Sequence, residues 1–285
     1  QGIALTRFDG VGRAAAPNRF EFSSDPTLLA DCDAILICMK SIATKQAARV
    51  LAGIARPDAV VVSLQNGISN ANVLRDRLGG RTVLAGMVGF NVAQIGDNRF
   101  HCGTEGEIVL GAGDRASEIA NRLNAAGIET TVSPGIEAIQ WGKLLLNLNN
   151  AINALSGLPL KEELSSRPYR QVLAASMREA LGVLKAAGIE YTKGFRHDDL
   201  MQITPVPGVK RTGSSSAQSL VRGVGSIETD YLNGEIVLIG RLHGVPVPAN
   251  AFLCDLGRRL INEGIPPGSL SIDDLQRAYE ESLAA

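Results

Sequence analysis

The chain has 285 residues, of which 45% are hydrophobic and 20% charged, and its 28 basic side chains nearly balance 29 acidic ones. This length allows two domains with substantial cores. A net charge near zero gives no electrostatic reason to expect a nucleic acid or an anionic membrane as partner, and no apolar run reaches the ~18 residues of a membrane span.

The cysteines and histidines indicate a reduced protein without a metal site. The four cysteines form no C-x-x-C pair and show no zinc-type spacing: Cys32, Cys38, Cys102 and Cys254. Reduced thiols are the rule in cytosolic proteins, so we expect a cytoplasmic location. The three histidines are scattered and form no ligand set: His101, His197 and His243.

From residue 26 to about residue 133, short apolar runs alternate with helical patterns. The runs are rich in branched residues and predict strands buried on both faces, as in a parallel sheet. They cover residues 33–40, 59–67, 82–90, 107–113 and 128–133. Helical spacing covers 44–56 and 115–126. This alternation predicts an α/β fold with an open, Rossmann-like parallel sheet.

After Ser133 and Pro134 the strand-like runs nearly vanish and helical patterns dominate. These patterns predict helices at 136–155, 167–187, about 215–242, 250–263 and 272–284. Ser166 and Ser271 stand at the start of two of these helices as candidate N-caps. We therefore expect a Rossmann-like dinucleotide-binding domain over residues 1–133 and an all-helical substrate or dimerisation domain over residues 134–285.

A nucleotide-binding α/β domain opens with a strand, a glycine loop of the form G-x-G-x-x-G/A, and a helix. Residues 10–15, GVGRAA, match this pattern, but Pro17 follows at once and no amphipathic helix succeeds it to face a pyrophosphate. We therefore reject the match. A βαβ unit of roughly 30 residues would supply the first strand, the glycine loop and the helix. We expect the sequence to be N-terminally truncated relative to its gene product.

The segment 141–150, WGKLLLNLNN, carries the strongest candidate for chemistry. Lys143 and Asn147 stand four residues apart, so a helix projects them from one face, one turn apart. The leucines between them indicate burial, and a buried lysine is costly unless it is paired. The alternative is an ammonium group that reaches water from a buried stem. Glu228, in the polar segment 226–235, is a candidate carboxylate partner.

Two polar residues stand where ligands of open α/β sheets bind, beyond the carboxyl ends of the strands. Lys40 ends the first buried run, and Asn66 stands at the end of the second. Each alone has an ordinary explanation, a charged residue leaving the core or an Asn-Gly turn. Together, on one edge of one sheet, they indicate a rim that faces a cofactor.

Six segments in this order resemble the ketopantoate reductase (2-dehydropantoate 2-reductase) family: CMK, LQNG, WGKLLLN, a serine-rich stretch, IETDYLNG and HGVPVPAN. The resemblance runs from Ile3 to about Gly264, and its specific parts are K-L-x-x-N and E-x-D-Y-x-N-G. It implies a Rossmann domain followed by an all-helical domain. It also implies NADPH as the cofactor and a small keto acid as the substrate.

The resemblance implies roles for single residues as well. Lys143 is the expected general acid that protonates the ketone oxygen, and Glu228 is expected to interact with this lysine, with the substrate hydroxyl and with the cofactor. Asn66 is expected to touch both the nicotinamide ribose and the substrate, and Lys40 to lie near the cofactor. The expected substrate-binding residues are Asn66, Asn147, Asn150 and Ser216.

The sequence departs from the family pattern in two places. Ala151 stands where the family often has a second asparagine, so Asn150 or Asn153 is expected in that role. The glycine loop is not in the sequence, which predicts that this chain binds NADPH far more weakly than a form with its upstream residues restored.

The leading functional hypothesis is NADPH-dependent reduction of 2-dehydropantoate to (R)-pantoate in pantothenate and coenzyme A biosynthesis. The alternatives are a reductase of another branched 2-keto acid and a non-catalytic dimeric relative that has lost nucleotide binding. In the leading hypothesis Glu228 and Ser216 converge with Lys143 on one substrate, which needs a bend at Gly223 and Gly225 in the expected helix. A homodimer is the one macromolecular assembly that we expect.

Overall fold

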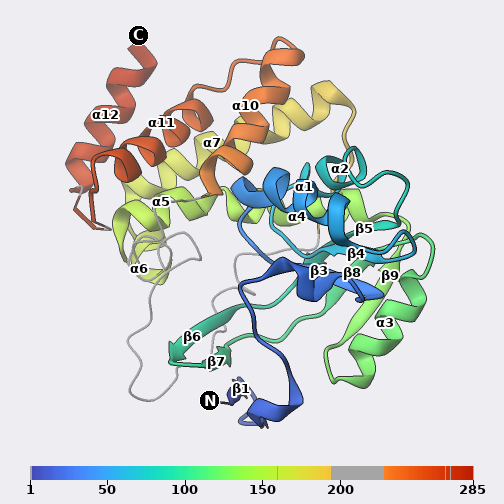
Figure 1. The fold of residues 1–285 in the computed structure, drawn as a ribbon. Helices are drawn as coiled ribbons and strands as arrows, with labels where there is room; N and C mark the ends of the chain where they lie inside the picture. Colours follow the sequence, from blue (N-terminus) through green and yellow to red (C-terminus); the bar gives the residue numbers. More distant parts are fainter. Residues whose placement is uncertain (1, 159, 194–227, 267, 270, 285) are drawn as a thin grey trace. The chain divides into compact units, whose positions relative to one another are not determined.

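The computed structural model describes residues 2–158, 160–193, 228–266, 268–269 and 271–284. These residues form two compact units, the first running to Gln140 and the second comprising the described residues from Trp141 onward. Strands and short helices make up the first unit, and helices make up the second (Figure 1). The order of a Rossmann-like part followed by a helical part is the one predicted.

The first unit is built on a five-stranded sheet in the order β3-β4-β5-β8-β9. Its strands are Ala34–Ile37, Val60–Ser63, Val83–Val88, Ile108–Gly111 and Thr130–Ser133, each inside a predicted run. Neighbouring strands are parallel except for β5 and β8, which are antiparallel. A parallel connection needs a crossover of a dozen or more residues, usually a helix. The chain between β5 and β8 contains a β-hairpin instead, so β8 returns in the opposite direction.

Both faces of this sheet are covered, which explains its continuous apolar runs. Val61 of β4 packs in a cluster with α1 (Thr44–Ile54) and α2 (Asn70–Arg75). Its neighbours Val60 and Val62 pack on the other side with α3 (Ala116–Ala125). The sheet is therefore covered by α1 and α2 on one face and by α3 on the other (Figure 1).

A second sheet of four strands, in the order β2-β1-β7-β6, was not predicted as a unit. It contains β1 (Ile3–Arg7), β2 (Gly12–Ala15), β6 (Val92–Gly96) and β7 (Arg99–Cys102). The strand β1 lies between β2 and β7, antiparallel to the first and parallel to the second. Residues 10–15 turn at Gly10 (φ +81°) into the antiparallel strand β2, so their glycine pattern opens no helix.

The second unit is helical, with two departures from the predicted helices. The helix predicted at 136–155 is two, α4 (Ile136–Asn147) and α5 (Asn149–Ser156), because asparagines with low helix propensity crowd the junction at Leu148. The predicted helix to residue 242 is interrupted at Leu232. A 3₁₀ turn, η4 (Glu228–Tyr231), precedes α10 (Asn233–Leu242).

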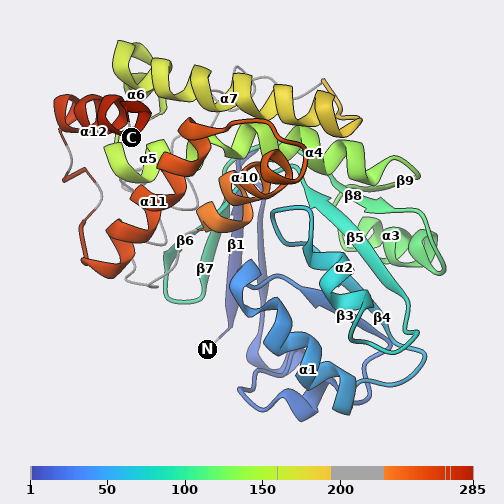
Figure 2. The same ribbon diagram turned by 90° about the horizontal axis from the view of Figure 1, so that it is seen from above.

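The other helices of this unit follow the sequence patterns closely. They are α7 (Arg167–Ala187), α11 (Pro248–Asn262) and α12 (Ile272–Ala284), while the short helix α6 (Leu160–Ser165) was not predicted. The long helix α7 packs against α10, α11 and α12 (Figure 2). Ser271 caps α12 as expected, since its Oγ accepts from the Asp274 N–H at 3.1 Å. Ser166 occupies the N-cap of α7, but its hydroxyl makes no capping bond.

The hydrogen bonds of Asn250 connect three helices of the second unit, α7, α10 and α11. It lies fully buried in the first turn of α11, and its Oδ1 accepts from Ser176 Oγ at 2.8 Å and from Asn233 Nδ2 at 3.1 Å. Its Nδ2 donates to the Ser176 carbonyl at 3.0 Å and to Glu179 Oε2 at 2.8 Å. Glu179 also accepts from the backbone N–H of Ala249 at 2.7 Å, so its carboxylate caps α11.

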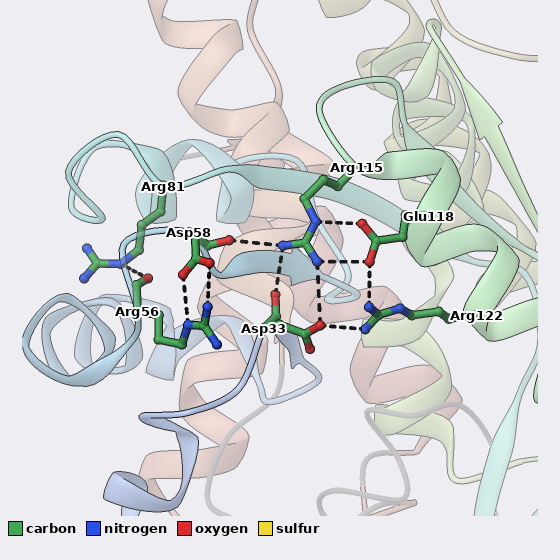
Figure 3. Close-up of polar contacts among 7 residues, drawn as sticks. All are labelled: Asp33, Arg56, Asp58, Arg81, Arg115, Glu118 and Arg122. Carbon is green, nitrogen blue, oxygen red and sulfur yellow. Dashed lines mark hydrogen bonds and ion pairs between the residues drawn. The ribbon is translucent and has the colours of Figure 1, made fainter.

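An ionic cluster joins the amino ends of the first unit's strands (Figure 3). This amino-edge cluster consists of Asp33, Arg56, Asp58, Arg81, Arg115, Glu118 and Arg122. Arg115 is its centre, with a bidentate pair to Glu118 at 2.7 and 3.0 Å. The same guanidinium donates to the carbonyls of Asp33 at 3.3 Å and Asp58 at 3.1 Å, at the entrances of β3 and β4. Arg115 thereby links two strands to the start of α3.

The position of Arg115 gives a prediction about stability. Its φ is +62°, a left-handed conformation that glycine tolerates and other residues adopt only at a cost. We expect the order of stability to be parent, then R115G, then R115A, because glycine relieves the backbone strain while both variants lose the ion pairs. R122A is the control, since the Arg122 guanidinium pairs at the surface with the side chains of Asp33 and Glu118. Urea denaturation checks this, and R115A as stable as R115G would contradict it.

Within the described ranges, no helix combines the length and hydrophobicity that crossing a bilayer requires. The cysteines are free thiols. The described residues do not gather three His, Cys, Asp or Glu side chains in a group that could hold a metal ion.

Candidate functional site

Two of the predicted site residues lie at the carboxyl edge of the main sheet. Lys40 follows β3 and directly precedes the 3₁₀ turn η3 (Ser41–Ala43). Asn66 follows β4, and β3 and β4 are neighbouring parallel strands, so both loops leave the same edge. Both residues are half-buried. The sheet therefore brings together the two positions that the sequence indicated as a rim.

A buried glutamine fixes the β3 loop to the end of β4. Gln65 is 6% exposed, and its Nε2 donates to the Met39 carbonyl at 3.1 Å and to Thr44 Oγ1 at 2.8 Å. Its Oε1 accepts from Ser63 Oγ at 3.1 Å. These bonds hold the backbone next to Lys40 against the strand that leads to Asn66.

A buried asparagine completes this support from α2. Asn70 accepts from Thr44 Oγ1 at 2.7 Å and donates to Ser41 Oγ at 3.0 Å. It also donates to the Asn66 carbonyl at 2.7 Å, which accepts from Ser41 Oγ at 3.1 Å as well. Sequence reasoning missed these supporting residues. Their one signal was the cluster of serine, threonine, glutamine and asparagine directly after two apolar strands.

Lys143 and Asn147 lie one turn apart on α4, as predicted from their spacing. Both are half-buried, whereas Leu144, Leu145 and Leu146 between them are 1%, 6% and 7% exposed. Burial lowers the pKa of Lys143 below its ordinary value of 10.5, because the charged form loses water. This desolvation argues against an ammonium group held fully in water at the end of a buried stem.

The two asparagines left open as alternatives differ in their surroundings. Asn153 is 2% exposed, and its Nδ2 donates to the Leu158 carbonyl at 3.0 Å and to Glu163 Oε2 at 2.8 Å. Its amide is therefore committed to packing α5 against the segment that leads to α6. Asn150, in the first turn of α5, is half-buried.

Glu228 is buried, at 5% exposure, in the first position of η4. The turn η4 packs against α10 and α11, and the adjacent Thr229 carbonyl accepts from the Cys254 thiol at 3.8 Å. Glu228 is thus not a surface acid, although an acid in a helical pattern ordinarily faces water. Ser216, the remaining predicted substrate residue, lies outside the described residues.

The chemistry of these groups is that of proton transfer and polar recognition. A lysine whose pKa is lowered by burial gives up its proton more readily than a surface lysine. Lys143, Asn147, Asn150 and Glu228 belong to the second unit, and the rim residues Lys40 and Asn66 to the first. Sequence reasoning also missed the acid Glu163, which lies fully buried on α6.

Comparison with known proteins matches nearly the whole chain to one family. Residues 1–115 match the family model described as "Ketopantoate reductase PanE/ApbA", and residues 135–260 match the model of its C-terminal domain. A curated 2-dehydropantoate 2-reductase from Halobacterium salinarum is 29% identical over 269 residues, which span 92% of this chain and 86% of the relative.

Solved structures agree with this match. A PanE/ApbA family ketopantoate reductase from Ralstonia eutropha is 30% identical with a TM-score of 0.79, covering 92% of this chain and 86% of that one. D-mandelate dehydrogenase with NADH and anilino(oxo)acetate shares the fold at 18% identity, with a TM-score of 0.69 over 82% and 77% of the two chains. So does a dimeric ketopantoate reductase from Staphylococcus aureus, at 16% identity and a TM-score of 0.69 over 93% and 88%.

Proposed function

Because this chain belongs to the ketopantoate reductase PanE/ApbA family, we propose that it reduces 2-dehydropantoate (ketopantoate) to (R)-pantoate, with NADPH as the reductant. This reaction is a step of pantothenate and coenzyme A biosynthesis. The observation that carries the proposal is Lys143, a half-buried lysine of lowered pKa that shares a helix face with Asn147. We also propose a homodimer in the cytoplasm, in keeping with the dimeric relative.

Lys143 is the general acid in this proposal. NADPH supplies the hydride to the ketone carbon when it is bound, and negative charge then develops on the ketone oxygen. The Lys143 ammonium stabilises this charge and donates the proton that completes the alcohol. Its desolvation strengthens both effects, since an ammonium out of water attracts the oxygen more strongly and releases its proton more easily.

The other polar groups orient the substrate. Asn147, one turn from Lys143, and Asn150 each offer an amide that both donates and accepts, which suits a hydroxyl or a carboxylate. Glu228, buried in η4, accepts from the substrate hydroxyl and orients the lysine. Ser216 binds the carboxylate end. Several groups fixed on one small molecule lower the entropic part of the barrier.

The carboxyl edge of the main sheet fits the nicotinamide end of a dinucleotide. Lys40 offers a cation to a phosphate, and Asn66 offers an amide to a ribose hydroxyl. Their loops are held by the buried hydrogen bonds of Gln65 and Asn70, so little ordering is required on binding. We propose that Lys40, Asn66 and Glu228 contact the cofactor and that Asn66 also contacts the substrate.

The test is a kinetic comparison of substrates with the purified full-length protein. We expect oxidation of NADPH with ketopantoate, and a kcat/KM about ten- to a hundredfold lower with the branched 2-keto acid that lacks the hydroxyl. That range is the cost of losing one hydrogen bond to a charged group. NADH in place of NADPH, measured in the same assay, decides the cofactor preference.

Two other outcomes would replace the proposal. A higher kcat/KM with another branched 2-keto acid would make that acid the substrate, an outcome that Ala151 favours because it is buried and nonpolar where relatives often carry an asparagine. No oxidation with any keto acid, together with no binding of NADPH in calorimetry, would make the protein a non-catalytic relative.

A further inference from the structure

A buried acid on α6 takes no part in the proposed chemistry. Glu163 is 0% exposed, and its Oε2 accepts from Asn153 Nδ2 at 2.8 Å and from Ser156 Oγ at 3.0 Å. A third residue of α5, Asn149, lies beside the same carboxyl group within hydrogen-bonding reach. Residues 149, 153 and 156 recur at helical spacing, so the Glu163 side chain contacts one face of α5 over two turns.

The second oxygen of this carboxyl group indicates its protonation state. Glu163 Oε1 is buried and has no hydrogen-bond partner among the residues that the structure describes, and the same holds for Asn149 Oδ1. An ionised carboxylate can only accept hydrogen bonds, so it leaves Glu163 Oε1 and Asn149 Oδ1 unsatisfied. A protonated carboxyl group carries an O–H on Oε1, so this oxygen gains a donor and the buried side chain carries no charge.

Among the side chains that the structure describes, no cation acts on Glu163 to compensate a negative charge. The α5 side chains that face Glu163 are neutral: Asn149, Asn153 and Ser156. On α7, the titratable neighbours are Tyr169, a phenol, and Arg170, whose guanidinium is taken by the carbonyls of Leu164 and Ser165 at 2.8 and 2.7 Å. Burial raises the pKa of Glu163 above its ordinary 4.5, and the hydrogen bonds from Asn153, Asn149 and Ser156 oppose this only in part.

The part of α5 that Glu163 contacts lies next to the candidate substrate residues. Asn149 is the first residue of α5, directly after the break at Leu148 that separates it from α4. Asn147 and Asn150 stand on either side of this junction. The bonds that Glu163 accepts from Asn153 and Ser156 fix how α5 is rotated, which bears on the direction of Asn150 and on its placement relative to Asn147 across the junction.

We infer that Glu163 is a neutral carboxylic acid in the folded protein and acts as a positioning residue, holding the start of α5 against the end of α4 so that Asn150 and Asn147 both meet the substrate. The part concerning the substrate rests on the function proposed above. The part concerning the neutral acid and the α5 junction is independent of it. The two parts are therefore tested by different measurements.

The neutral acid is tested by the pH dependence of stability with E163Q, whose amide has the shape and the donor of the protonated acid. A raised folded pKa makes the contribution of Glu163 full below pH 4.5 and lost as the pH rises through the folded pKa. Relative to E163Q, the parent's folding equilibrium constant should thus fall by up to about tenfold per pH unit in that window. E162Q, on the exposed neighbour, should follow the parent. A parent that gained stability over E163Q with rising pH would overturn the assignment.

Positioning is tested by E163A against E163Q. We expect E163A to raise KM for ketopantoate on the order of tenfold, the scale of a small misplacement of binding groups, while E163Q keeps the parental KM. We also expect faster amide hydrogen exchange at residues 147–150 in E163A alone. Parental exchange in folded E163A, or equal damage in E163Q, would overturn the inference. An inactive parent would refute the proposed function, and the exchange and stability results would still decide the rest.

Discussion

Replacing Lys143 by alanine should lower kcat for ketopantoate by about 10²-fold or more, the range for losing a general acid. The half-buried ammonium is the proton donor of the proposed reaction, and α4 contains no second lysine or other cationic side chain that could take its place. Steady-state kinetics on the full-length protein measure the change. Binding of NADPH, measured by calorimetry, should stay near the parental value.

The lysine has a matched control in K185A, which removes an exposed lysine from the last turn of α7. This variant should keep the parental kcat. The parent's kcat should also fall as the pH rises through the lowered pKa of Lys143, because the acid must be protonated. A K143A variant with near-parental kcat and normal cofactor binding would remove Lys143 from the mechanism.

The free energy of unfolding of K143A shows whether a loss of activity comes from the chemistry or from misfolding. A lowered folded pKa means that the contribution of Lys143 to stability is full above 10.5 and is lost as the pH falls through the folded pKa. At neutral pH the desolvated ammonium is therefore a cost, which offsets the packing of its methylene stem. We expect the free energy of unfolding to change by less than about 1 kcal/mol.

Replacing Asn250 by alanine should destabilise the helical unit by about 3 kcal/mol or more. The side chain of Asn250 makes four hydrogen bonds in a fully buried position, and its loss leaves the Asn233 amide and the Ser176 hydroxyl without that partner. Each buried group left unsatisfied costs about 1–3 kcal/mol. Urea denaturation followed by circular dichroism measures the loss.

N262A is the control for this variant, since Asn262 is exposed in the last turn of the same helix. Its free energy of unfolding should stay within about 0.5 kcal/mol of the parent. If N250A lost no more than N262A, the bonds of Asn250 would contribute little and the unit would rest on its apolar core alone.

The sequence predicted those elements whose signals are local. The helix α12 has Ser271 as its N-cap and α7 has Pro168 in its first turn, features that act through the nearest backbone. The buried strands were equally clear as runs of branched residues. The reversal of β8 and the hairpin of β6 and β7 were missed, because strand direction depends on pairing between distant segments and leaves no periodic trace.

In the candidate site, too, the sequence predicted the features that depend on local spacing and missed those that depend on packing between helices. The spacing of Lys143 and Asn147 placed them on one helix face without further information. The burial of Glu228 and the engagement of Asn153 by Glu163 depend on which helices pack together, and the sequence of one helix does not carry that information. The buried acid itself was unforeseen, since glutamate in a short helix ordinarily faces water.

The amino-edge cluster bears on how the first unit opens. Arg115 bonds to carbonyls that lie 82 and 57 residues earlier in the chain. Contacts between such distant positions close long loops and form only after the strands have assembled. Interactions absent from the folding transition state leave the rate of folding almost unchanged and slow the rate of unfolding. The cluster therefore acts as a kinetic barrier, prolonging the lifetime of the folded sheet at the edge opposite Lys40 and Asn66.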